Sequence, residues 1–439
     1  MNRFLLLTAA FGLLFQSALA QEFDKAKLDG YFDALEENNR FMGSVAVSQN
    51  GRIVYTRAAG FADVENNIPA DGNTKYRIGS ISKTFTAVLV LKAVEENKLD
   101  LKQPIDKYFP IIKNAADITI ERLLYHRSGI RNFTEDEKYL TWHTQPKTEA
   151  EMTAIIAEGG SVFEPGSRTA YSNSNYALLT YILEKAFQKP YAQLLKEYIA
   201  TPTGLENTYL GGKINPKNNE CKSYRYDGEW KPESETDISI PLGAGGVVST
   251  PTDLVKFSEA LFGGKLLRKE SLEQMKTIKE NFGMGLIQTP FYNQIGLGHG
   301  GGIDGFVSIF CYFPGSNLSY ALTSNGMNYN FNNISIAVLS AVNGMPYEIP
   351  EFKTVHINPA DLEKYLGVYS SEQFPLKIAI TRENDRLMGQ ATGQSAFPLE
   401  AAGEDKFRFD QAGIVIEFNP AENTMILKQG VMQFLYKKE

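Results

Sequence analysis

The chain has 439 residues, of which 43% are hydrophobic and 22% are charged, and its formal net charge is −7 at pH 7. This length exceeds what one compact domain usually needs, and the apolar fraction is enough for a sizeable core. The net negative charge argues against a nucleic-acid-binding protein, because such a protein needs a basic surface.

Residues 1–20 have the pattern of a secretory signal peptide. Arg3 precedes a short apolar run, and Ala18-Leu19-Ala20 forms a small-x-small cleavage site. The run is too short and too interrupted to span a bilayer comfortably. We therefore predict cleavage after Ala20, a periplasmic or secreted protein, and no membrane span in the mature chain.

The next segments predict a sheet assembled from distant parts of the chain. Residues 24–39 form an amphipathic helical pattern, and two strand-like runs in 43–60 flank Asn50-Gly51, which favours a tight hairpin turn. Strands before and after a mainly helical stretch indicate one sheet with an inserted helical region. The later elements are predicted in this order: helices near 80–97, 118–126, 149–158, 174–187, 190–198 and 251–262, strands near 305–313 and 318–323, and a helix near 332–343.

The C-terminal part of the chain has a different pattern. Residues 343–359 carry three prolines and little periodicity, and 360–439 consist of short alternating runs separated by polar turns. Such runs are typical of an antiparallel meander or small barrel. We predict a main domain at 21–345, a linker at 346–359 and a β-barrel-like domain at 360–439.

Ser80 and Lys83 stand at the start of a predicted apolar helix. Residues three apart on a helix lie on one face, so the hydroxyl and the amine can touch. Burial lowers the pKa of a lysine from about 10.4, and a neutral amine can take the proton of a serine hydroxyl. The alternative is structural: a serine that caps the helix and a lysine that reaches solvent.

Two further segments carry groups suited to the same chemistry. Tyr171 and Asn173 lie in a turn just before a helix, where a tyrosine can relay protons and an asparagine can hold an amide. His299 precedes three glycines and a strand, and glycines let a substrate approach the backbone closely. The alternatives are ordinary turn chemistry at 171–173 and a flexible loop at the glycines.

Cysteines and histidines give little further information. Cys221 and Cys311 could form one disulfide or remain two buried thiols. The four histidines lie far apart without a metal-binding spacing, so we expect neither a metal nor a cofactor.

Together these motifs resemble the serine β-lactamase and penicillin-binding protein superfamily, which carries Ser-x-x-Lys, then Ser-x-Asn or Tyr-x-Asn, then Lys-Thr-Gly. The resemblance is to the class C β-lactamase and DD-peptidase branch, and within it to esterase-like members with His-x-Gly as the third motif. It spans about 25–345, and the C-terminal part resembles a lipocalin-like β domain. The accessory stretches that agree are "KLDLKQPIDKYFP" (98–110), "LLYHRSGI" (123–130) and "GAGGVVSTPTDLVKF" (243–257).

The resemblance implies an α/β fold, in which an antiparallel sheet is flanked by helices with a helical subdomain, and a small all-β C-terminal domain. It also implies roles for single residues. Ser80 would be the acylated nucleophile, Lys83 the general base or its partner, and Tyr171 the proton shuttle. Asn173 would contact the substrate amide, and His299 would replace the lysine of the third motif. Gly301 would match the motif glycine, and the N–H groups of Ser80 and Gly302 would form the oxyanion hole.

Two departures from the family pattern affect the expected substrate. His299 replaces a fixed cation that helps bind a substrate carboxylate, and an imidazole is largely neutral near pH 7. Gly300 replaces a threonine or serine and removes a hydroxyl from the same place. We therefore expect an exported serine hydrolase that cleaves a small-molecule ester, amide or peptide, D-amino-acid peptides included. The alternatives are a D-alanyl-D-alanine carboxypeptidase or β-lactamase, and a penicillin-binding-like sensor of cell-wall fragments that does not turn over. The oligomeric state is left open.

Overall fold

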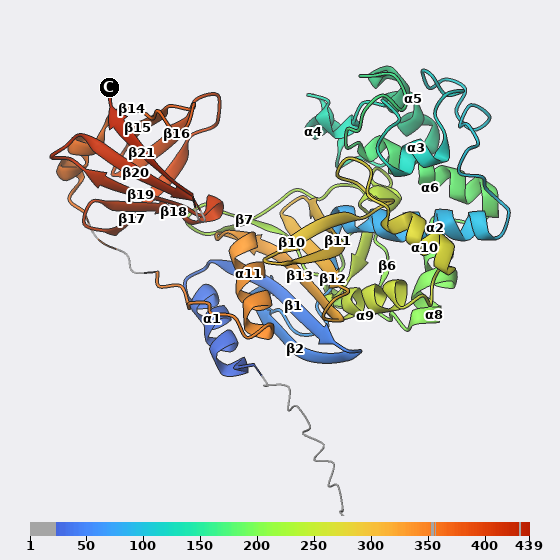
Figure 1. Ribbon diagram of the computed structural model, residues 1–439, viewed down its shortest axis with the longest axis horizontal. Helices are drawn as coiled ribbons and strands as arrows, with labels where there is room; N and C mark the ends of the chain where they lie inside the picture. The colour runs from blue at the N-terminus through green and yellow to red at the C-terminus, as the bar shows by residue number, and fades with distance from the viewer. Residues whose placement is uncertain (1–22, 353–354, 356, 430–431) are drawn as a thin grey trace, which may run out of the picture.

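The computed structural model describes residues 23–439 except 353–354, 356 and 430–431. The predicted signal peptide and its cleavage site lie outside the described residues. A central sheet lies between a helical region on one side and a small barrel on the other (Figure 1). None of the helices in the described ranges is long and apolar enough to cross a membrane.

The central sheet joins the first strands of the chain to strands more than two hundred residues later. Its hairpin β1–β2 turns at Asn50 and Gly51, whose φ angles of 53° and 77° match the predicted turn. Strand β1 pairs antiparallel with β13, from Phe41 opposite Met327 to Gln49 opposite Leu318. The main path runs β10-β11-β12-β13-β1-β2, with bounds Ile287–Phe291, Gln294–Ile303, Phe306–Phe313, Leu318–Met327, Phe41–Gln49 and Arg52–Ala59.

Alternation along β1 directs its side chains to two separate cores. Val45 and Val47 pack with α1 (Lys25–Glu37) and α11 (Phe331–Val342), which cover one face of the sheet. Ala46 faces the opposite side and packs with the helical region and α9 (Pro251–Phe262). Successive strand residues point to opposite faces, so both faces of the sheet are covered.

The helical region surrounds α2 (Ser82–Glu95), in which every residue from Ser82 to Leu91 is buried. The longer helices around it are α5 (Glu149–Gly159), α6 (Asn173–Phe187) and α10 (Lys269–Lys276). A helix that is apolar on nearly all sides can be stable only inside a core. The shorter elements are β3 Phe61–Asp63, β4 Ile68–Pro69, β5 Tyr76–Arg77, η1 Gly79–Ile81, α3 Ile120–Leu124, η2 Phe133–Glu135, α4 Tyr139–Trp142, α7 Tyr191–Leu195, η3 Lys196–Ala200, α8 Thr201–Thr203, β6 Tyr209–Leu210, η4 Pro216–Asn218, β7 Tyr224–Tyr226, β8 Trp230–Pro232, η5 Leu242–Ala244 and β9 Val247–Ser249.

The glycine run after His299 is part of strand β11, so the alternative of a flexible loop is wrong, and the strand begins before the glycines rather than after them. His299 is paired with Phe310 of β12, and Gly301 with Ser308. Glycine weakens an isolated strand, but here the ladder with β12 overrides that preference. A Cβ at Gly301 would lie 2.0 Å from the carbonyl oxygen of Ile78, so only glycine lets this strand approach the segment before Ser80.

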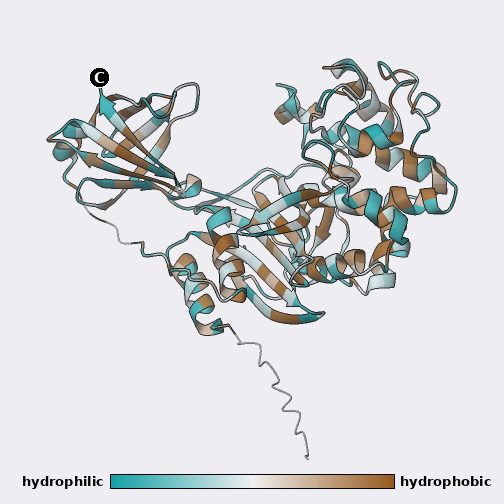
Figure 2. Cartoon of the chain, in the orientation of Figure 1, coloured by the Kyte–Doolittle hydropathy of each residue, from teal (hydrophilic) through white to brown (hydrophobic). Residues whose placement is uncertain are grey.

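The C-terminal part forms a closed barrel of eight antiparallel strands in chain order. Inward residues such as Ile378 and Ile380 alternate with less buried ones, and this alternation of hydropathy is visible along the barrel strands (Figure 2). The predicted fold class, a helix-flanked antiparallel sheet with a helical region and a small all-β unit, is confirmed. The elements are η6 Pro359–Tyr365, β14 Gly367–Ser370, β15 Ile378–Glu383, β16 Arg386–Ala391, β17 Phe397–Gly403, β18 Lys406–Phe409, η7 Asp410–Ala412, β19 Ile414–Asn419, β20 Thr424–Gln429 and β21 Met432–Lys438.

The two cysteines do not form a disulfide. Cys221 and Cys311 are free thiols, and both are buried.

Candidate active site

Ser80 lies in the short 3-10 turn η1, which leads directly into α2, rather than in the first turn of the α-helix. Ser82, the first residue of α2, donates a hydrogen bond of 2.7 Å to the carbonyl of Gly79 and accepts one of 3.0 Å from the N–H of Val247. Gly79 has a φ of +49°, and a Cβ there would lie 2.7 Å from the nitrogen of Gly302. The turn that carries Ser80 is therefore pressed against β11.

Lys83 is completely buried, and three oxygen atoms surround its amine. Nζ lies 3.0 Å from Ser80 Oγ, 2.7 Å from Asn173 Oδ1 and 2.6 Å from the carbonyl oxygen of Ala244. Burial lowers the pKa of Lys83 well below its usual value. A neutral amine has two N–H groups and one lone pair. The amide and carbonyl oxygens can accept both hydrogens, which leaves the lone pair facing the Ser80 hydroxyl.

Tyr171 contacts the same hydroxyl from the other side. Its phenol donates a hydrogen bond of 2.7 Å to Ser80 Oγ, and its ring centroid lies 4.9 Å from Lys83 Nζ. Burial raises the pKa of Tyr171 to about 12, although its hydrogen bond with Ser80 opposes the rise. The phenol therefore keeps its proton near neutral pH, whereas burial shifts the pKa of Lys83 in the direction that favours its neutral amine.

His126 holds the segment of Tyr171 in place, a function that its sequence position did not reveal. Its ring centroid lies 4.5 Å from that of Tyr171, and its Nδ1 accepts the N–H of Ser172 at 3.1 Å. Burial and the nearby Lys83 hold the pKa of His126 well below its usual value. A neutral imidazole can accept this hydrogen bond.

Asn173 begins α6 and is fixed at three atoms. Its Oδ1 accepts from Lys83, its Nδ2 donates to Thr134 Oγ1 at 3.2 Å, and its backbone N–H donates to Asn132 Oδ1 at 3.0 Å. The side chain that the family pattern assigns to the substrate amide is thus also the partner that orients the lysine.

His299 lies on β11 near Tyr171, with 6.4 Å between the ring centroids. It is 5% exposed, and its Nδ1 lies 2.5 Å from the carbonyl oxygen of Gly300. Burial, with the nearby Lys83, lowers the pKa of His299 to about 4. The imidazole is therefore neutral at pH 7, as expected from the sequence, and it supplies no fixed cation.

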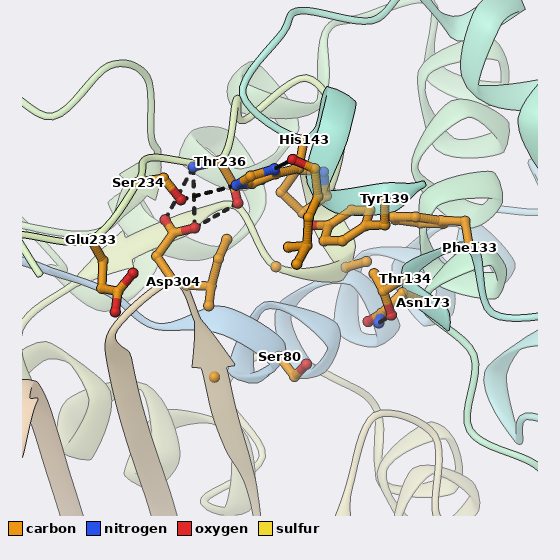
Figure 3. A pocket seen from close by; sticks show the side chains of 16 residues that line it. Ser80, Phe133, Thr134, Tyr139, His143, Asn173, Glu233, Ser234, Thr236 and Asp304 are labelled. Carbon is orange, nitrogen blue, oxygen red and sulfur yellow. Dashed lines mark hydrogen bonds between the residues drawn. The ribbon is translucent and has the colours of Figure 1, made fainter. Parts of the chain in front are cut away.

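A cavity of about 410 Å³ opens beside Ser80 (Figure 3). Asn173 and Gly302 contribute to its wall, but most of its lining was not predicted. The additional residues with polar or aromatic side chains are Phe133, Thr134, Tyr139, His143, Glu233, Ser234, Thr236 and Asp304. They come from irregular segments and short turns, where no periodic pattern marks them. The described part of the chain contains no group of three or more His, Cys, Asp or Glu side chains that could hold a metal ion.

Residues 28–342 match the family model described as Beta-lactamase. The chain belongs to the beta-lactamase family. It is 27% identical to a penicillin-binding protein of Bacillus subtilis over 429 residues, which cover 90% of this chain and 94% of the relative. It is also 27% identical to a teichoic acid D-alanine hydrolase of Staphylococcus aureus, over 52% of this chain and 55% of that protein.

Two solved structures resemble the fold of this chain. The D-amino acid amidase of Ochrobactrum anthropi matches with a TM-score of 0.64 and 27% identity, over 73% of this chain and 98% of its own. An octameric penicillin-binding protein homologue from Pyrococcus abyssi matches with a TM-score of 0.67 and 25% identity, over 94% and 100%. The resemblance inferred from the motifs is therefore confirmed at the level of the superfamily. The chain is a serine hydrolase of the β-lactamase and penicillin-binding protein superfamily.

Proposed function

We propose that this hydrolase forms an acyl-enzyme on Ser80 and hydrolyses a small ester or amide, with amino-acid derivatives included. One observation carries the proposal. A single hydroxyl oxygen, Ser80 Oγ, lies 3.0 Å from a buried lysine amine and 2.7 Å from a tyrosine hydroxyl. A nucleophile, a base and a proton donor within hydrogen-bond distance are the parts that nucleophilic acyl transfer needs.

The protonation states assign a direction to the proton path. Neutral Lys83 takes the proton of Ser80 as Oγ attacks the carbonyl carbon of the substrate. The N–H groups of Ser80 and Gly302 receive the oxyanion. As the bond to the leaving group breaks, Tyr171 gives its proton to the departing nitrogen or oxygen, and the Lys83 ammonium replaces that proton. Water then attacks the ester on Ser80 by the same path in reverse.

The site supports a hydrolase of simple esters and amides more strongly than it supports a carboxypeptidase, a β-lactamase or a sensor. A carboxypeptidase or β-lactamase of this family needs a cation for the substrate carboxylate, and burial keeps His299 neutral at pH 7. Relatives named for a D-amino acid amidase and a D-alanine hydrolase support amino-acid esters and amides as substrates. A sensor would need no group to accept the proton of a deacylating water, and Lys83 and Tyr171 are both in reach of Ser80.

We also propose a periplasmic or secreted location. This proposal rests on the signal-peptide pattern of residues 1–20.

The test is covalent labelling combined with turnover. A fluorophosphonate probe should label Ser80, as located by mass spectrometry of the labelled peptide. Chromogenic esters and amino-acid amides should be hydrolysed over many turnovers, and Ser80→Ala should lose both properties. A label on another residue would refute the nucleophile. A single acylation without turnover would favour the sensor, and faster hydrolysis of benzylpenicillin than of simple esters would favour the β-lactamase.

A further inference from the structure

The cavity beside Ser80 has an acidic wall. Glu233 and Asp304 both line it, and none of the described residues in its lining is a lysine or an arginine. A cavity with this lining disfavours a substrate carboxylate and favours a positive group. The two carboxylates differ in how far their charge is already compensated.

Asp304 is fully engaged by the protein itself. It accepts hydrogen bonds from the N–H and the hydroxyl of Thr236, and Arg77 pairs with it at 3.2 Å. The Arg77 and Asp304 side chains are 2% and 3% exposed. Arg77 also pairs with Glu235 and donates to the carbonyls of Gly212 and Thr236. We conclude that Asp304 fixes the wall of the cavity and has little capacity left for a ligand.

Glu233 is different, because it is only partly compensated. Its Oε1 lies 3.2 Å from Nε of Arg225, which is itself 61% exposed, and such exposed pairs are weak. No hydrogen bond to Oε2 is recorded within the described ranges. The side chain extends over Gly305 in the turn between β11 and β12, where a Cβ would lie 3.2 Å from its Cγ. Its carboxylate stands at the side of the cavity (Figure 3).

The acyl group and the leaving group of a substrate lie on opposite sides of Ser80, one in the cavity and the other beside Tyr171. Tyr171, which hands its proton to the leaving group in the proposed mechanism, does not line the cavity, and neither does His299. The leaving group therefore lies on the Tyr171 side. The acyl group occupies the cavity, which is the side that Glu233 lines.

We propose that Glu233 binds a free ammonium group on the acyl part of the substrate, so that the preferred substrates are aminoacyl esters and amides. This inference rests on the proposed acyl-enzyme function and specifies its substrate class. A carboxylate that meets an ammonium group in a partly enclosed cavity forms a charge-assisted hydrogen bond. An N-acylated substrate has no positive charge at this position, and it would leave Glu233 without the partner.

The experiment compares D-alanine p-nitroanilide with its N-acetyl derivative, on wild type, Glu233→Gln, Glu233→Lys and Glu229→Gln. Glu229 is an exposed glutamate of the same β7–β8 hairpin and lies outside the cavity lining, so it is the matched control. The quantity measured is the ratio of kcat/KM for the free amine to kcat/KM for the acetylated substrate.

We expect this ratio to fall about tenfold in Glu233→Gln, as for the loss of one charge-assisted hydrogen bond, and further in Glu233→Lys. Glu229→Gln should change it less than about twofold, as expected for a surface charge. In wild type the ratio should also fall above pH 8, because an α-amino group loses its charge with a pKa of about 7.7–8.0.

Fluorophosphonate labelling of Ser80 in every variant separates two kinds of failure. If Ser80 is labelled but the ratio is the same in wild type and Glu233→Gln, the ammonium site is wrong and the acyl-enzyme stands. An equal fall in Glu229→Gln would also overturn it. If the wild-type protein is not labelled on Ser80 and hydrolyses none of the substrates, the proposed function fails, and this inference fails with it.

Discussion

The central sheet and the C-terminal barrel are both antiparallel, but they are assembled in opposite ways. In the barrel each strand pairs with the next one in the chain, from β14 to β21, and the last strand closes on the first. In the central sheet β1 pairs with β13, and the chain between them forms the helical region. Because its strands pair with their neighbours in the chain, the barrel is a unit with its own core. The central sheet forms only when segments that are distant in the chain pair with each other.

The active site depends on the distant contacts. Ser80, Tyr171 and His299 come from three separated parts of the chain, and each is placed by contacts with another of these parts. Several polar pairs join the barrel to the main body. Arg40 lies 2.7 Å from Glu400 and 3.5 Å from Asp410, and Gln411 contacts Asn328 and Asn330. Removing a single functional group from the active site should therefore reduce activity far more than removing the whole barrel.

The largest effect is expected at the nucleophile. Ser80→Ala removes the oxygen that would form the acyl bond, so hydrolysis should fall by at least about 10⁴-fold and labelling should disappear. Ser167→Ala, at an exposed serine before the Tyr171 turn, is the matched control and should keep full activity. The melting temperature of both variants should equal that of wild type. Residual turnover by Ser80→Ala close to the wild-type rate would place the nucleophile elsewhere.

Lys83 and Tyr171 should contribute to the same step. Acid–base groups supply about 10²–10⁴-fold, so Lys83→Ala and Tyr171→Phe should each lower kcat by that range. The double variant should lose much less than the product, because both residues serve one proton path. The measurement is single-turnover acylation by a chromogenic ester. Losses that multiply would show that the two residues act independently.

The pH dependence should report the buried lysine. Lys83 acts as a base only when neutral, so kcat/KM should rise with pH through the lowered pKa of Lys83 and fall about tenfold per unit below it. His299→Gln should leave the midpoint of this curve unchanged, because the pKa of His299 is about 4 and the imidazole is already neutral above pH 5. A midpoint that moves by a full unit in His299→Gln would assign the titration to the imidazole.

A cation at position 299 should change the substrate preference moderately. His299→Lys restores the residue type of the family pattern and should raise kcat/KM for carboxylate-bearing substrates, relative to neutral esters, by about tenfold. The gain is limited because Gly300 still lacks the family hydroxyl and because the position is 5% exposed, which disfavours a charge. The change in preference is measured by competition between a penicillin and a neutral ester, and His299→Gln is the uncharged control. An unchanged ranking would mean that His299 only shapes the strand.

Sequence patterns predicted what depends on local signals and missed what depends on tertiary contacts. The Asn50-Gly51 turn, the apolar helix α2 and helix α6 after Tyr171 were all predicted, because turn residues and periodicity mark them. Strand β11 was missed, since its glycines form a strand only through the ladder with β12. Glu233 and Asp304 were missed because one lies in the irregular segment after β8 and the other in the turn after β11, and only tertiary contacts bring these segments to Ser80.

The smallest effect is expected from removing the whole barrel. A chain that ends after Pro350 keeps Tyr347, whose carbonyl accepts from Lys27 and whose ring contacts Tyr31, and so keeps the packing of α1. Arg40 loses Glu400 and Asp410, but the truncation exposes its guanidinium to water, which hydrates the charge.

This truncated chain should fold, should be labelled on Ser80, and should keep kcat/KM for a small ester within about threefold, since the cavity is lined by main-body residues alone. Thermal unfolding and active-site titration measure this against the full chain. The matched control is full-length Arg40→Gln, which removes the ionic contacts but keeps the barrel. If the truncated chain is insoluble or unlabelled while Arg40→Gln is active, the barrel completes the core of the main body. The active site would then depend on the barrel as well as on the central sheet.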